Sequence, residues 1–103
     1  MEGQGTPGGM ATEIEANSEI QAIADTVKPA VQEKLGRELQ VYQAKSYCWQ
    51  VVAGTNYFIK ILTGPGDECI HVRVLVSLPH VERAITLHGI QEHKKSSDPL
   101  IYF

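Results

Sequence analysis

The chain has 103 residues, which fits one compact domain, and its composition, 43% hydrophobic and 20% charged, is typical of a soluble globular protein. A formal net charge of −3 with scattered basic residues argues against nucleic acid as a partner, because phosphate binding needs clustered lysine and arginine. No segment approaches the roughly 20 apolar residues of a membrane span, so we expect no membrane partner either.

Residues 1–16 are predicted to form a flexible arm, because their glycines offer almost no side chain to pack. The start of the chain has no positive charge and no apolar run, so it resembles neither a secretory signal nor a transit peptide, and we expect a cytoplasmic protein. Cys48 and Cys69 are the only cysteines and need not pair in a reducing compartment. We expect each to be a small, semi-buried hydrophobic residue.

The segment from Ser18 to Gly36 has the pattern of an amphipathic helix. Ser18 with Gln21 predicts a capping box at its start, and Gly36 suits its end. Pro29 removes a backbone hydrogen bond within the pattern, which leaves open either a kinked helix or two short ones. Apolar residues at helical spacing predict the face that packs on the core: Ile20, Ile23, Ala24, Val27, Val31 and Leu35.

After Leu39 the apolar period changes to two, which indicates strands. Four are predicted, at about 41–50, 55–63, 68–76 and 84–91, and the breaks between them contain turn residues. One helix followed by four strands with short connections predicts an α+β domain, with the helix on one face of an antiparallel meander. Residues 92–99 are expected to form a polar loop, and the apolar segment 99–103 is expected to dock on the body.

Catalysis and metal binding are both disfavoured by the spacing of the reactive residues. Cys69 and His71 would point to the same face of a strand, but no oxyanion loop accompanies them, and a cysteine nucleophile needs a histidine base that a third group orients. Zinc sites usually need two spaced pairs of ligands, and no second pair exists. We therefore predict no enzyme activity, no metal and no cofactor.

The turns are more informative about function. In an up-and-down meander the first and third connections share one end of the sheet. The first connection includes Val51 and Val52, and the third includes Leu78 and Pro79, so this end gathers apolar residues and suggests a binding surface. The pattern leaves a structural alternative open, in which the two valines end a buried strand and Leu78-Pro79 caps the core.

Residues 50–60 read Gln-Val-Val-Ala-Gly-Thr-Asn-Tyr-Phe-Ile-Lys, which resembles the signature of the stefins, the type 1 cystatins. Other segments resemble that family in the same order: Pro-Gly-Gly-Met at 7–10, Ile-Gln at 20–21, Lys-Pro at 28–29, Ser-Leu-Pro-His at 77–80 and the terminal Tyr102-Phe103. The resemblance covers residues 7–103, so the chain is read as a single domain of this type.

The resemblance implies the cystatin fold, a long helix packed on a curved antiparallel sheet of four to five strands, the first strand coming from the N-terminal arm. It also implies a reversible, tight-binding, competitive inhibitor of papain-like cysteine proteases such as cathepsins, which fills their cleft with a wedge. The implied contacts are Gly8 as the reactive-site glycine, Gly9, then Gln50, Val51, Val52, Ala53 and Gly54 in a first loop, and Leu78, Pro79 and His80 in a second.

Two further alternatives stay open at this point. A non-inhibitory intracellular interaction module of the same fold is the competing function, although the intact segment 50–54 argues against it. Trp49, next to the first loop, is interpreted as packing on a strand face, with a side contact to the protease as the other option. The tight reversal at Val51 and Val52 suggests strain, so we expect mostly monomer with a domain-swapped dimer formed by hairpin exchange.

Overall fold

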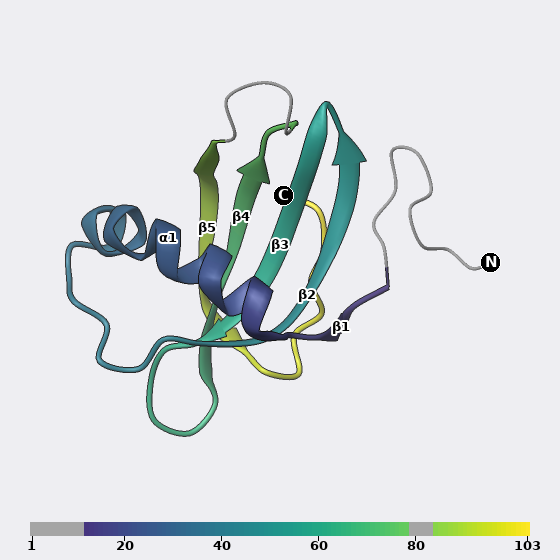
Figure 1. The fold of residues 1–103 in the computed structure, drawn as a ribbon. Helices are drawn as coiled ribbons and strands as arrows, with labels where there is room; N and C mark the ends of the chain where they lie inside the picture. Colours follow the sequence, from purple (N-terminus) through teal and green to yellow (C-terminus); the bar gives the residue numbers. More distant parts are fainter. Residues whose placement is uncertain (1–11, 79–83) are drawn as a thin grey trace.

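The computed structural model describes residues 12–78 and 84–103. The elements follow in the order β1 (Ile14–Glu15), α1 (Ser18–Leu35), β2 (Gln43–Val52), β3 (Gly54–Leu62), β4 (Glu68–Val76) and β5 (Ile85–Lys95). The strands form one five-stranded antiparallel sheet in that same order, and α1 lies across one face of it (Figure 1). The predicted α+β meander is confirmed, and β1 is the additional first strand that the resemblance implied.

The cap of α1 differs from the prediction. Asn17 is the N-cap, and its side-chain oxygen accepts a hydrogen bond from the Ile20 N–H at 2.9 Å. The predicted capping box of Ser18 and Gln21 is wrong, because Gln21 faces the sheet. Its amide oxygen accepts a hydrogen bond from the Ala44 N–H at 2.8 Å, which links the first turn of the helix to β2.

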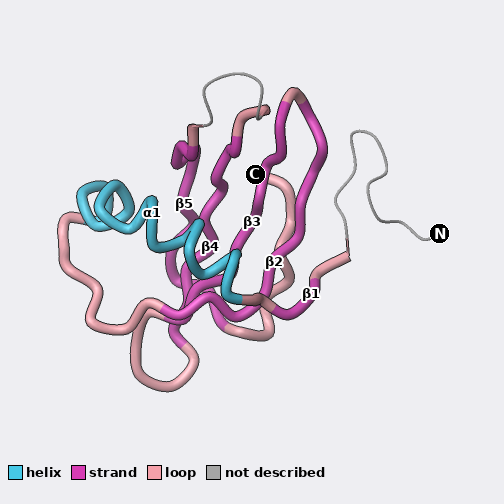
Figure 2. The backbone as a smooth tube through the Cα atoms, in the orientation of Figure 1, coloured by secondary structure: helices cyan, strands magenta, loops and turns pink. Residues whose placement is uncertain are grey.

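Pro29 lies inside α1, and the helix still runs as one uninterrupted element (Figure 2). The axis changes direction between its two halves (Figure 1), so of the two alternatives the kinked helix is correct. Gly36 ends the helix as predicted. It has a φ of 73°, and its N–H donates to the carbonyls of Gln32 and Glu33, which satisfies the last turn.

The main core lies between α1 and the sheet. The predicted helix face is buried except for Leu35, which is half-buried. Side chains of β3 and β4 meet it from the sheet: Ile59, Ile61, Ile70, Val72 and Val74. Full burial of each aliphatic side chain stabilises the fold by roughly 1.5–3 kcal/mol, so this layer makes the sheet a firm support for its loops.

The other face of the sheet is covered by the C-terminal segment. Leu100 and Phe103 pack with Cys48 and Phe58, and the Phe103 ring meets the Phe58 ring edge-on with centroids 5.7 Å apart. Arg73 Nη1 donates to the Phe103 carbonyl oxygen at 2.7 Å. The predicted docking of the apolar terminus is confirmed for Leu100 and Phe103, whereas the side chains of Ile101 and Tyr102 are exposed. This packing helps to explain why β3 is buried on both faces.

Two predicted boundaries are wrong. The polar loop predicted from residue 92 belongs to β5 as far as Lys95, because Lys94 and Lys95 pair with the start of β4. The predicted arm 1–16 is not flexible in its last residues, because Ile14 and Glu15 form β1 and the Ala16 N–H donates to the Lys45 carbonyl oxygen at 3.0 Å. In both cases a backbone ladder with a distant segment holds residues that look like loop locally.

Candidate functional site

The tip of the β2–β3 hairpin lies at the same end of the sheet as the end of β4 and the start of β5, and the β3–β4 turn lies at the other end (Figure 1). At the base of the β4–β5 connection the Ser77 N–H donates to the Ala84 carbonyl oxygen at 3.0 Å. In return the Ala84 N–H donates to Ser77 Oγ at 2.8 Å. The shared end predicted from the meander is therefore confirmed, and the second connection has a firm base.

The tip of the β2–β3 hairpin exposes apolar side chains. Val51 is 56% exposed, Val52 is 44% exposed, and Ala53 at the turn is also exposed. Leu78, at the start of the β4–β5 connection, is 37% exposed. The alternative in which the valines end a buried strand is wrong. We call the set of residues 51–54 and Leu78 the apolar edge, and such a gathering on a small domain is typical of a binding surface.

Gly54 brings the two connections together. Its φ is 116°, a conformation that residues with a Cβ rarely adopt. A Cβ at this position would lie 2.5 Å from the Val76 carbonyl oxygen and 3.2 Å from Ser77 Cα. Glycine therefore lets the tip of the first hairpin pack directly against the backbone at the end of β4, where the second connection begins.

A buried polar pair supports the tip from within. Gln50 and Asn56 face each other across the hairpin, are 8% and 4% exposed, and are joined by a hydrogen bond from Asn56 Nδ2 to Gln50 Oε1 of 3.4 Å. Gln50 belongs to the predicted contact segment, but its side chain is turned inward. The sequence reasoning missed Asn56, although hairpin symmetry about Ala53 would have placed it opposite Gln50.

The register of β1 on β2 bears on where an arm could reach. Ile14 lies opposite Tyr47 and Glu15 opposite Ser46, so a strand that continued this antiparallel register toward the N-terminus would run along β2 in the direction of Val52. The separation in sequence from Gly9 to Ile14 equals that from Tyr47 to Val52, so an extended arm has the reach to bring Gly9 to the tip. The predicted contacts Gly8, Gly9, Pro79 and His80 themselves lie outside the described residues.

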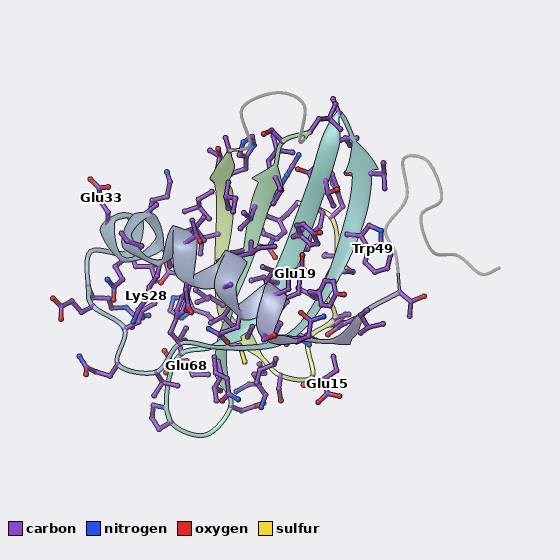
Figure 3. All side chains as sticks on the ribbon, in the orientation of Figure 1. Glu15, Glu19, Lys28, Glu33, Trp49 and Glu68 are labelled. Carbon is purple, nitrogen blue, oxygen red and sulfur yellow. The ribbon has the colours of Figure 1, made fainter. Side chains whose placement is uncertain are left out.

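Behind the tip, Trp49 lies on β2 (Figure 3) and belongs to a group of aromatic rings. Its ring centroid is 5.9 Å from that of Tyr47, which in turn is 6.1 Å from that of Tyr57. Trp49 also lies opposite Tyr57 across the β2–β3 ladder, and it is half-buried. These contacts favour the interpretation in which Trp49 packs on the strand face.

The two thiols lie in environments that suppress thiolate formation. Both are buried; burial raises the pKa of Cys48 to about 12 and also raises that of Cys69. Burial lowers the pKa of His71 to about 4, and neither ring nitrogen has a hydrogen-bond partner. A nucleophilic cysteine needs the opposite shifts, a low thiol pKa beside a charged imidazole.

Within residues 12–78 and 84–103, no cluster of three or more histidine, cysteine, aspartate or glutamate side chains could bind a metal ion. In the same two ranges, no helix has the length and apolar character needed to cross a bilayer.

Residues 8–97 match the family model described as the Cystatin domain. Cystatin-B of Oplegnathus fasciatus is 44% identical over 93% of this chain and 95% of its own length. Cystatin-B of Mus musculus is 41% identical over 93% of this chain and 97% of its own. Cystatin-B of Homo sapiens is 46% identical over 85% of this chain and 89% of its own. The chain is therefore a stefin-type member of the cystatin family, whose members inhibit cysteine proteases and are not enzymes.

Proposed function

We propose that this protein is a reversible, tight-binding, competitive inhibitor of papain-like cysteine proteases, cathepsins among them. The wedge consists of the arm at Gly8 and Gly9, a first loop at residues 50–54 and a second loop at residues 78–80. The observation that carries the proposal is the apolar edge, where Gly54 packs on the backbone at the end of β4 and exposed Val51 and Val52 lie at the same end of the sheet as Leu78.

The chemistry of the apolar edge suits a narrow cleft. A papain-like protease holds its thiolate beside an imidazolium at the bottom of such a groove. The tip of the first hairpin offers small apolar side chains and no charge, so it would expel water without leaving polar side chains unpaired. Its strands are paired up to Val52 and Gly54, and a preformed hairpin loses little conformational entropy on docking.

A wedge of this kind blocks the cleft without being cleaved. The hairpin reverses the chain at Ala53 instead of laying an extended segment along the groove. No scissile carbonyl then needs to sit at the thiolate, so binding proceeds without turnover. Protease–inhibitor interfaces bury about 1,600 Å² and include some of the tightest complexes known, so a wedge with three contact segments can bind tightly.

We place the protein in the cytoplasm, as mostly monomer. Cys48 and Cys69 are both free and buried, which suits a reducing compartment where a small domain is stable without a disulfide. The core between α1 and the sheet supplies that stability instead.

The direct test is a titration of papain and two or three cathepsins with the full chain at several substrate concentrations. We expect inhibition that substrate relieves competitively, with slow dissociation of the complex. If no papain-like enzyme is inhibited at micromolar concentration, the proposed function fails, and a non-inhibitory interaction module of the same fold becomes the better description.

A further inference from the structure

The carboxylate of Glu13 joins four separate segments of the chain. Glu13 directly precedes β1, and its side chain reaches the face of the sheet opposite α1. Its Oε2 lies 3.0 Å from Lys60 Nζ on β3 and accepts a hydrogen bond from Ser46 Oγ on β2. Its Oε1 accepts a hydrogen bond from the Leu100 N–H at 3.3 Å. We call this group of contacts the Glu13 latch.

Lys60 makes the latch strong. The residue is 4% exposed, and its amine also donates to the Ser96 carbonyl oxygen at 2.6 Å. A buried ammonium group is unfavourable without a counter-charge, and removing one partner of such a pair leaves the other uncompensated. Within the described residues, Glu13 is the acid that forms an ion pair with Lys60. Lys60 therefore favours the position of Glu13 on the sheet.

β1 itself has little else to hold it. It is two residues long, both residues are exposed, and it forms the edge of the sheet. Short edge strands with little buried surface are among the first parts of a fold to open. Within the described residues, this end of the chain before α1 is otherwise anchored by the ladder with β2, by the Ala16 hydrogen bond to Lys45 and by the packing of half-buried Ala16 against the main core.

We propose that Glu13 is a positioning residue for protease inhibition, a role that rests on the proposed wedge. By fixing β1 against β2, the latch would favour an arm that continues the register of β1 along β2 toward the apolar edge. Without the latch, β1 would detach more readily, and the arm would then be tethered from a point closer to the helix cap at Asn17. A longer, less directed tether lowers the effective concentration of Gly8 and Gly9 at the cleft.

The test compares Glu13→Ala with Glu15→Gln in the full chain and in a chain lacking residues 1–9. Glu15 is the neighbouring acid on β1, it is exposed, and it provides a matched loss of charge (labelled in Figure 3). In the full chain, we expect Glu13→Ala to speed dissociation from papain by about tenfold and Glu15→Gln to leave it unchanged. In the shortened chain, Glu13→Ala should have no further effect, because the arm through which it acts is gone.

Hydrogen exchange of the free protein gives a readout that needs no protease. The Ala16 amide should exchange faster in Glu13→Ala than in the unchanged protein, while amides of β3 keep their protection. If the body has become unstable, the β3 amides also lose protection; Glu13→Gln, which keeps the shape of the side chain, then replaces Glu13→Ala in the dissociation measurement.

The outcomes separate the two proposals. If the unchanged chain does not inhibit papain, the proposed function fails and the role of Glu13 fails with it. If the unchanged chain inhibits papain and Glu13→Ala or its replacement dissociates at the same rate, only the latch is overturned. If Glu13→Ala weakens inhibition equally in the full and the shortened chain, the latch is also overturned, because Glu13 would then act through the stability of the body.

Discussion

Gly54 and Val76 approach so closely that a Cβ on Gly54 would lie 2.5 Å from the Val76 carbonyl oxygen. This contact joins the tip of the β2–β3 hairpin to the end of β4, which leads into the second connection. The tip of the first loop and the end of β4 that leads into the second are therefore one structural unit. A change at the contact should alter both loops, even if it leaves every exposed side chain in place.

Gly54→Ala should destabilise the fold by more than about 2 kcal/mol, because alanine adds a backbone clash to the strain of a positive φ. Gly66→Ala is the matched control: Gly66 has a φ of 69°, but a Cβ there would have no atom within 4 Å. We expect that control to cost about 1 kcal/mol in urea unfolding and to leave inhibition of papain unchanged. Equal effects of the two substitutions would show that the contact with Val76 is unimportant.

Val52→Asp should weaken inhibition of papain at least about thirtyfold, because docking would bury an unpaired carboxylate at the centre of the interface. Val41→Asp provides the control, since Val41 is exposed to a similar degree, 39% against 44%, and precedes β2 at the opposite end of the sheet. Inhibition constants of both variants check the prediction. A wedge that tolerates the aspartate at position 52 would have to make its contacts elsewhere.

The arm is tested by Gly8→Trp and by deletion through Gly9. We expect both to weaken inhibition markedly, because a bulky side chain prevents close approach of the backbone and the deletion removes the contact altogether. The measurement is the dissociation rate of the papain complex. Unchanged inhibition by both variants would remove the arm from the mechanism and leave the two loops as the whole wedge.

The lowered pKa of buried His71 predicts that the folded protein loses stability at mildly acidic pH. Burial, then the positive charges of Lys60 and Lys94, lower its pKa from 6.5 to about 4, while the nearby acids Glu13 and Asp98 act in the opposite direction. The unfolded chain then binds one more proton than the folded chain between these two values. The free energy of unfolding should fall by at most about 3 kcal/mol as the pH drops from about 6.5 to about 4.

Urea unfolding at pH 7, 5.5 and 4 measures this dependence of the free energy of unfolding on pH. His71→Leu should flatten this dependence, whereas His88→Leu, at an exposed position on β5, should keep it.

Glu13 contributes to stability at lower pH. Partial burial alone would raise its pKa, but hydrogen bonds from Ser46, Lys60 and the Leu100 N–H lower its pKa below 4.5. Its contribution is lost as the pH falls through that lowered pKa, so this step should survive in His71→Leu.

Two chains are expected to exchange their β2–β3 hairpins and so form a domain-swapped dimer. The positive φ at the tip falls on Gly54, where glycine tolerates it, so the backbone conformation gives the valines no special strain of this kind. Exchange still needs only that the β2–β3 hairpin open at Ala53 and re-form the same ladder between two chains. Size-exclusion chromatography after mild heating should show dimers, and a strictly monomeric profile would count against exchange.

Local patterns were sufficient for much of the fold and for part of the site. The helical spacing from Ile20 to Val31 identified the buried face of α1, because one side of an amphipathic helix must face the core. Alternation and turn residues identified the meander, and with it the shared end of the first and third connections. Residues 50–60 identified the family, since their order is specific over a long run.

Contacts between distant segments decided the rest. Ser18 and Gln21 fit a capping box in sequence, but β2 provides Gln21 with a better partner in Ala44. Lys94 and Lys95 read as a loop until Cys69 and Glu68 of β4 pair with them. Three contacts depend on which strands become neighbours. They are the inward turn of Gln50, the approach of Gly54 to Val76 and the ion pair of Glu13 with Lys60. No local window contains that information, because the free energy of each contact comes from two segments that folding alone brings together.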